Sequence, residues 1–125
     1  MNKLLMVLVG LAAIVMVATG VRWMVDPSAA AAQLGMPLLD GVARSSQVGD
    51  MTAFFLTTGI LMLTALVTGR RGYFFAPALL LGLTAVARTV AWMVHDAALA
   101  MHLIAPEVII AVLLLLASYR LAEKA

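Results

Sequence analysis

Three ionisable residues lie inside long apolar segments of this sequence, and their side chains could do chemistry together. Asp50, Arg88 and Glu107 occur in three different apolar segments. A guanidinium placed between two carboxylates can satisfy its donors through bidentate hydrogen bonds. The same groups could perform acid–base chemistry, with one carboxyl group donating a proton while the other, ionised beside Arg88, accepts one. We therefore take these three residues as candidate catalytic residues.

The composition of the chain shows why charges in such segments are unusual. Of its 125 residues, 65% are hydrophobic and 11% are charged. A soluble domain of this length cannot bury that much apolar surface, so we expect an integral membrane protein. The absence of cysteine excludes disulfides and thiol nucleophiles. No basic patch with interleaved aromatic residues is present, so a nucleic-acid partner is not expected.

Four apolar segments are each long enough to cross a membrane as a helix. They cover about residues 4–25, 42–68, 73–94 and 98–119. At about 1.5 Å per residue, roughly 20 residues cross the hydrocarbon layer of ~30 Å. A helix also satisfies every backbone polar group within its own segment, as lipid demands. The sequence therefore predicts an all-α protein, an integral membrane four-helix bundle in which residues 1–125 form a single domain.

The basic residues predict how the chain is oriented in the membrane. They gather at the start, at the second connection and at the end of the chain: Lys3, Arg70, Arg71, Arg120 and Lys124. Because basic residues favour the cytoplasmic side, we expect both termini in the cytoplasm of a bacterium and a multi-pass protein of its inner (plasma) membrane. The first segment is expected to stay as a span rather than to be cleaved as a signal peptide. Trp23, Tyr73 and Tyr119 are expected in the interfacial aromatic belts.

The connection between the first two spans carries the signals of a short helix. Asp26 is a suitable N-cap, Pro27 suits the first helical position, and Gly35 suits the residue that ends the helix. The segment is apolar enough to lie against the outer mouth of the bundle as an interfacial helix. It could serve as a plain surface connector or as a lid.

The three candidate residues reach similar depths in the outer half of the membrane when residues are counted along each span. An unpaired charge at that depth costs at least ~2.5–3.5 kcal/mol, so we expect Arg88 to pair with Asp50, Glu107 or both. Two stripes of small residues could let the helices approach closely enough. They consist of Ser45, Gly49 and Ala53 in the second span and of Ala78 and Gly82 in the third.

Further residues are expected to bind a ligand around the trio, because they lie on nearby faces or near the outer mouth. They are Arg44, Gln47, Phe54, Trp92, His95 and His102. Trp92 and Phe54 would supply flat apolar walls. A site of two histidines and a carboxylate can be drawn with Asp96 and Glu107, but no ligand spacing supports it. We therefore predict neither a metal site nor a cofactor.

These features predict the intramembrane binding of a lipophilic small molecule in a pocket open to the outer side. Isomerase or epoxide-opening chemistry by the Asp50, Arg88 and Glu107 trio stays open, so the sequence does not decide whether the chain is an enzyme. The alternative is a non-catalytic accessory or assembly subunit of a larger membrane complex, in which the charges fix helix register. Expected partners are membrane lipids, the small molecule, and a second copy or another membrane protein.

Several short motifs also follow one another in a recognisable order along the chain. They are Asp26-Pro27, Leu34-Gly35, Arg44, Ala87-Arg88, Asp96 and Pro106-Glu107. In this order they resemble small bacterial four-helix membrane families of unknown function, broadly the DoxX-like group. The resemblance extends over nearly the whole chain and implies a four-span bundle. It implies no substrate and no reaction.

Overall fold

The described part of the chain, residues 2–122 of the computed structural model, forms five α-helices and no strand. The helices are α1 (Asn2–Val25), α2 (Pro27–Gln33), α3 (Gly41–Thr68), α4 (Arg71–Val94) and α5 (Met101–Arg120). All except the short α2 are long and apolar enough to cross a membrane. The predicted all-α class is therefore confirmed, and the four long helices are those expected of a multi-pass membrane protein.

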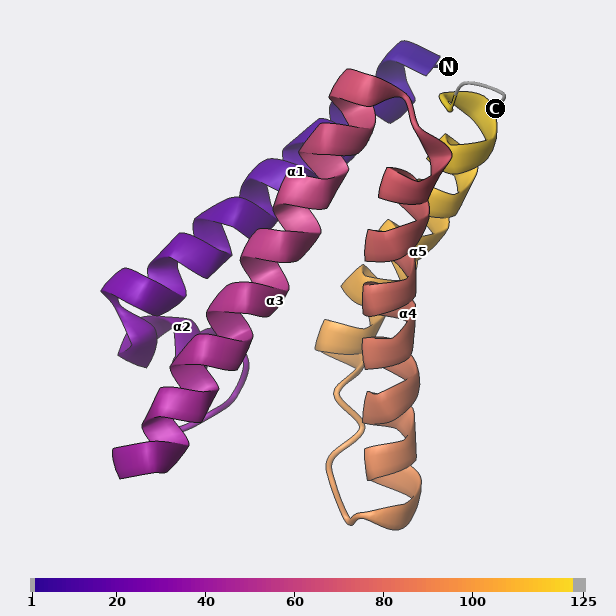
Figure 1. The fold of residues 1–125 in the computed structure, drawn as a ribbon. Coiled ribbons are helices and arrows are strands. Elements are labelled where there is room, and N and C mark those ends of the chain that lie inside the picture. The colour runs from indigo at the N-terminus through magenta and orange to yellow at the C-terminus, as the bar shows by residue number, and fades with distance from the viewer. Residues whose placement is uncertain (1, 123–125) are drawn as a thin grey trace.

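The helices form two arms that meet at one end and separate toward the other (Figure 1). In the first arm α1 packs along α3, and α2 packs against α1. In the second arm α4 packs along α5. We call the end near the α3–α4 connection the joined end and the opposite end the open end. The start of α1 and the end of α5 both lie at the joined end.

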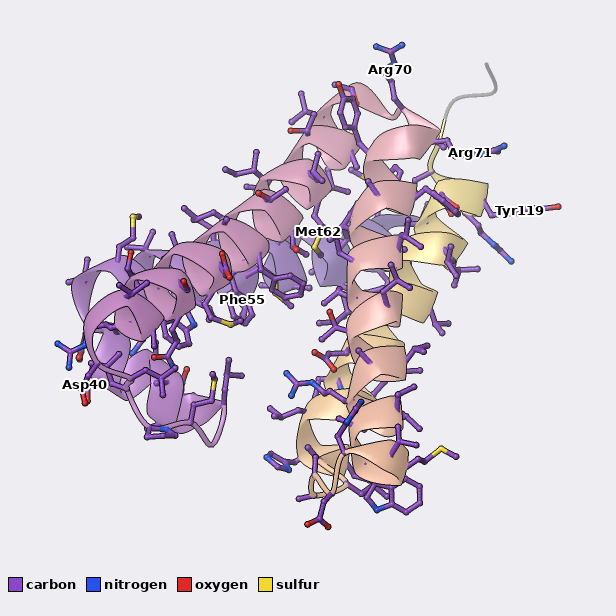
Figure 2. The ribbon with its side chains drawn as sticks, turned by 60° about the horizontal axis from the view of Figure 1, so that its bottom comes forward. Asp40, Phe55, Met62, Arg70, Arg71 and Tyr119 are labelled. Atoms are coloured by element: carbon purple, nitrogen blue, oxygen red, sulfur yellow. The ribbon has the colours of Figure 1, made fainter. Side chains whose placement is uncertain are left out.

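The main hydrophobic core lies where the arms meet. From α1 it receives Leu5, Val9, Ala13 and Met16, whose spacing places them on one helix face. Buried residues of α3, α4 and α5 complete the same cluster, and Met62 of α3 lies between the arms (Figure 2). All four long helices therefore contribute to one core near the joined end.

The backbones of α1 and α3 approach closely at two glycines. A Cβ atom added to Gly59 would lie 2.9 Å from the carbonyl oxygen of Ala13 and 2.9 Å from the backbone nitrogen of Val17. A Cβ added to Gly20 would lie 2.9 Å from the backbone nitrogen of Leu56. These distances are shorter than real Cβ contacts, so only glycine fits.

The small-residue stripes expected from the sequence do not make this approach. A Cβ added to Gly49 or to Gly82 would meet nothing within 4 Å. Ser45 and Ala53, which flank Gly49 on the same stripe, are exposed. The stripe around Gly49 therefore does not bring helices together. In the other stripe Ala78 is buried in the main core, although Gly82 makes no such contact. The backbone approach at glycines lies between α1 and α3.

The short helix α2 begins and ends as predicted. The Asp26 carboxylate accepts a hydrogen bond of 3.4 Å from the backbone nitrogen of Ala29, and Pro27 opens the helix. Gly35 has a φ of 71°, and the backbone nitrogen of Met36 donates to the carbonyl of Ala31 at 2.9 Å. These bonds satisfy the last carbonyls of the helix in the Schellman arrangement.

Trp23 and the start of the last long helix differ from expectation. Trp23 has an exposed fraction of 0% and packs against α2 and α3, so its placement in an interfacial belt is wrong. The fourth span was expected from about residue 98, but α5 begins at Met101. The chain turns at Asp96, whose φ is 56°, and residues 96–100 are not helical.

The charged residues outside the long apolar runs divide between the two ends of the molecule. Arg70 and Arg71 lie at the joined end, with Tyr119 nearby, and Asp40 lies at the far end of the first arm (Figure 2). The side chain of Arg71 also ties the two helices of the second arm together, because its Nε donates to the carbonyl of Ser118 at 3.2 Å. Lys124 lies outside the described residues.

Candidate functional site

Arg88 of α4 pairs with Glu107 of α5, which lies beside it in the second arm. The Nε–H group of Arg88 donates to both carboxylate oxygens of Glu107, at 3.0 Å to Oε1 and 3.2 Å to Oε2. The side chains retain 28% and 12% of their exposure, so the pair is partly rather than fully buried. Because each charge neutralises the other, the pair lowers the cost of placing either one in an apolar helix.

The outer edge of the Arg88 guanidinium remains free of protein partners. Nε makes the bonds to Glu107, while neither Nη1 nor Nη2 has a hydrogen-bond partner among residues 2–122. Their four N–H donors can therefore bind an acceptor without breaking the existing pair. Glu107 acts on this edge indirectly, because its carboxylate holds the guanidinium in place.

Asp50 of α3 approaches Arg88 from the other arm without touching it. The carboxylate of Asp50 is exposed, and no hydrogen bond or ion pair to it occurs within the described chain. The structure therefore holds a charged pair and a separate carboxylate in place of the contiguous trio expected from the sequence. No charged side chain among the described residues is fully buried.

A pocket of about 260 Å³ nevertheless brings Asp50 and Arg88 to one site between the arms. Its lining residues are Leu34, Asp50, Met51, Phe54, Phe55, Thr84 and Arg88. The first arm supplies the apolar wall and one carboxylate, and the second arm supplies the guanidinium. We call this space the inter-arm pocket.

The aromatic wall of the inter-arm pocket consists of Phe54 and Phe55. Their ring centroids are 5.1 Å apart and their planes meet at 85°, an edge-to-face arrangement. Phe55 projects from α3 toward the space between the arms (Figure 2). Phe55 and Met51 also pack against the buried cluster of Trp23, Ala30 and Ala31, which supports this wall on its other side.

Gln47 does not line the inter-arm pocket, and its side chain instead stabilises a neighbouring loop. Its side chain is 6% exposed and binds the connector that follows α2. The amide oxygen accepts from the backbone nitrogen of Leu39 at 2.9 Å, and the amide nitrogen donates to the carbonyl of Pro37 at 3.1 Å. This clamp fixes the connector whose Leu34 forms one edge of the pocket.

The other predicted ligand-binding residues lie away from the inter-arm pocket. Arg44 is exposed and bonded to the connector, through 2.7 Å to the carbonyl of Leu39 and 3.2 Å to the carboxylate of Asp40. Trp92, His95 and His102 are exposed near the α4–α5 connection, and none of them lines this pocket. Of the predicted site residues, the structure thus brings together Asp50, Phe54 and Arg88, with Glu107 behind Arg88.

Four pocket residues were not singled out as site residues from the sequence. Thr84 lies four residues before Arg88 on the same helix face, which was a usable signal. Met51 and Phe55 follow directly after the predicted Asp50 and Phe54, but nothing in an apolar run marks them. Leu34 comes from the connector, and sequence alone does not show where a connector folds back.

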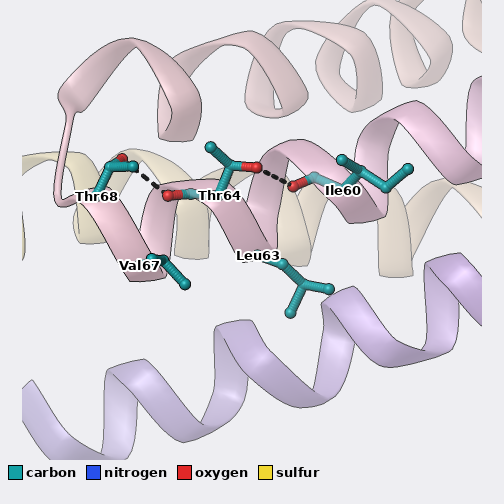
Figure 3. Close-up of a pocket in the computed structure, with 5 residues that line it drawn as sticks. All are labelled: Ile60, Leu63, Thr64, Val67 and Thr68. Atoms are coloured by element: carbon teal, nitrogen blue, oxygen red, sulfur yellow. Dashed lines mark hydrogen bonds between the residues drawn. The ribbon is translucent and has the colours of Figure 1, made fainter.

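Two further hollows on the surface offer no free polar group. One lies along α3 and is lined by Ile60, Leu63, Thr64, Val67 and Thr68 (Figure 3). Its two threonine hydroxyls already donate to carbonyls of their own helix, at 2.8 Å each. The other lies between α4 and α5, where the hydroxyl of Thr89 is likewise bonded to the carbonyl of Ala85. The inter-arm pocket is the one of these three with unpartnered charged groups.

The described residues form no metal-binding group, and the chain matches no known protein. Within residues 2–122, no group of three or more histidines and carboxylates is placed to hold a metal ion. Comparison with known proteins found no family model, no curated protein and no solved structure that matches the chain.

Proposed function

We propose that the chain is a multi-pass protein of a bacterial inner membrane, with both termini in the cytoplasm and α2 at the outer interface. The basic side chains Arg70 and Arg71, which lie together at the joined end, support this orientation. The order of short motifs supports a DoxX-like family.

Single cysteines test this orientation cleanly because the chain has none of its own. A membrane-impermeant maleimide applied to intact spheroplasts is expected to label Ser28→Cys in α2. It should leave Gly72→Cys, which keeps Arg70 and Arg71 and whose added Cβ meets nothing within 4 Å, unlabelled until the membrane is opened. The reverse pattern would overturn the orientation.

We also propose that the inter-arm pocket binds a lipophilic small molecule that enters from the outer half of the membrane. One observation carries this proposal. The inter-arm pocket has apolar walls and is also lined by two charged groups without a hydrogen-bond partner in the described chain, the carboxylate of Asp50 and the Nη groups of Arg88. An ionisable group inside a membrane segment is expensive and is usually retained for function. A ligand with a polar head and an apolar body would satisfy both charged edges and the Phe54 wall.

Acid–base chemistry on such a ligand would fall to Asp50 and Arg88. Asp50 has a free carboxylate that could take a proton, and the Nη edge of Arg88 could stabilise negative charge developing on an oxygen. Isomerisation or epoxide opening would use these two groups, with Glu107 as a positioning residue. A turnover assay belongs after the ligand is known.

The experiment that tests ligand binding is native mass spectrometry of the gently extracted protein, followed by denaturation to identify what is released. A stoichiometric small molecule is expected in the wild type. It should be lost in Arg88→Leu and in Asp50→Asn, and retained in the matched control Asp96→Asn on the exposed α4–α5 connection. Retention in all variants would overturn the site.

The same spectra distinguish the second candidate function and the expected partners. A protein that carries no small molecule and arrives attached to a different membrane chain would favour an accessory subunit. Twice the chain mass would show a second copy, and bound lipids would appear as a ladder of larger masses. Each outcome therefore gives a different mass in the spectrum.

A further inference from the structure

The Nη groups of Arg88 and the carboxylate of Asp50 require opposite kinds of hydrogen-bonding group in the head of a ligand. Arg88 offers the N–H donors of Nη1 and Nη2, so it needs an acceptor oxygen. Asp50 offers only acceptor oxygens while ionised, so it needs an N–H or O–H donor. A ligand that satisfies the site must carry both kinds of group, close enough together to fit a pocket of about 260 Å³.

The charge balance of the site selects among such ligands. Arg88 and Glu107 neutralise one another, so the carboxylate of Asp50 leaves the three groups with one net negative charge. Like charges that share a pocket with an apolar lining repel one another more strongly than they do in bulk water. A fatty acid or another anionic head group would add a second negative charge and is disfavoured, whereas a cationic head group restores neutrality.

The aromatic wall points to the same ligand class. Phe54 lies one helical turn after Asp50, and Phe54 and Phe55 both line the pocket that Asp50 lines. Aromatic faces attract ammonium groups, and they do so more strongly where water is excluded. A carboxylate beside two phenyl rings is therefore a suitable environment for an amine.

The size of the pocket sets how much of the ligand it holds. Pockets for drug-sized molecules usually measure ~300–1,000 Å³, so a space of about 260 Å³ suits a head group and the first part of a chain. The remaining chain would lie along the apolar helix faces outside. The ligand is then an amphiphile rather than a compact polar metabolite.

We propose that the inter-arm pocket takes an amphiphile whose head carries an ammonium group with a hydroxyl or carbonyl oxygen next to it, as in a long-chain amino alcohol. The ammonium group binds Asp50 and the phenyl wall, and the oxygen accepts from the Nη edge of Arg88. This assignment rests on the proposed binding function and narrows it to one chemical class.

Three probes of equal chain length test the class directly: 2-aminododecan-1-ol, dodecane-1,2-diol and 2-hydroxydodecanoic acid. Their heads are cationic, neutral and anionic. Binding is measured by displacement of a fluorescent amphiphile from the protein in a maltoside detergent. The amino alcohol is expected to bind about tenfold more tightly than the diol, and the hydroxy acid more weakly than either.

Variants locate the binding and control for simple partition into the detergent. Asp50→Asn should reduce the affinity for the amino alcohol to that for the diol, and Arg88→Lys should weaken both because the planar Nη edge is lost. Asp96→Asn removes an exposed carboxylate elsewhere and should change nothing, since asparagine tolerates the positive φ at that position.

The possible failures are distinguishable from one another. One contrary result is that the diol or the hydroxy acid binds more tightly than the amino alcohol, and that its binding is lost in the Asp50 or Arg88 variant. That result would overturn the ligand class and leave the inter-arm pocket as the binding site. Binding of the amino alcohol that survives Asp50→Asn would overturn the assignment of Asp50. Failure of the folded wild type to bind the amino alcohol would overturn the ligand class. Failure of the binding function itself would appear in the native mass spectra as a protein that releases no small molecule.

Discussion

The close contact of α1 with α3 makes Gly59→Ala a demanding test of the fold. The added Cβ would lie 2.6 Å from Cγ2 of Val17, which could turn away, and 2.9 Å from two backbone atoms, which could not. Ordinary van der Waals contact begins near 3.4 Å, so the two helices must separate by about 0.5 Å. Such a gap forfeits roughly a quarter of the dispersion energy of each neighbouring contact. Overpacking of this kind typically costs ~1–3 kcal/mol.

Gly49→Ala is the matched control because it makes the same change in the same helix. Its Cβ would meet nothing within 4 Å, so only the intrinsic preference of a helix for alanine remains. That preference acts in both variants and cancels in the comparison. Titration with sodium dodecyl sulfate in mixed micelles, followed by circular dichroism, should show Gly59→Ala unfolding at lower denaturant by ~1–3 kcal/mol relative to Gly49→Ala. Equal or greater stability of Gly59→Ala would show that α1 and α3 do not touch as described.

Three other predictions follow from individual contacts. Arg88→Leu should lower the free energy of unfolding by about 1–3 kcal/mol because it leaves Glu107 unpaired. Adding Glu107→Gln should recover most of that loss. Full additivity of the two free-energy changes in this double-mutant cycle would refute the pair. Gln47→Leu should speed hydrogen exchange at the backbone amides of Leu38 and Leu39, since the connector loses its bonds to the Gln47 side chain. Unchanged exchange would show that this side chain does not stabilise the connector. In Trp92→Phe the fluorescence comes from Trp23 alone and should resist acrylamide, because that indole is fully buried; strong quenching would contradict its placement.

The long helices and α2 were predictable because their signals are local. Long, predominantly apolar segments define the spans, and Asp26 and Gly35 mark the two ends of α2 by capping chemistry. A partner for Arg88 at its own depth was expected, since charges at one level in neighbouring helices can meet. The sequence left open whether that partner is Asp50, Glu107 or both, and the structure shows Glu107. Each of these inferences used distance along a helix, which a sequence gives directly.

The features that the sequence did not reveal depend on distance between helices. Counting residues places Asp50 at the depth of Arg88, but it does not show that the arms separate there and leave a pocket. Gly20 and Gly59 were overlooked because each glycine lies alone in an apolar run, whereas the more regular stripe around Gly49 contacts nothing. Trp23 matched an interfacial position by depth, and only the folding of α2 over it explains its burial.

If the four long helices insert into a membrane as proposed, the order of the arms along the chain has a consequence for that insertion. Arg88 and Glu107 are 19 residues apart and belong to one helical hairpin, so they can neutralise each other during insertion, before the second arm docks on the first. Their joint transfer lowers the cost of ~2.5–3.5 kcal/mol that each isolated charge would incur. Asp50 belongs to the hairpin synthesised earlier and receives no such help. In such an insertion its carboxylate would meet lipid or water without a protein partner, and Arg88 would come to the same pocket only after the second hairpin docks.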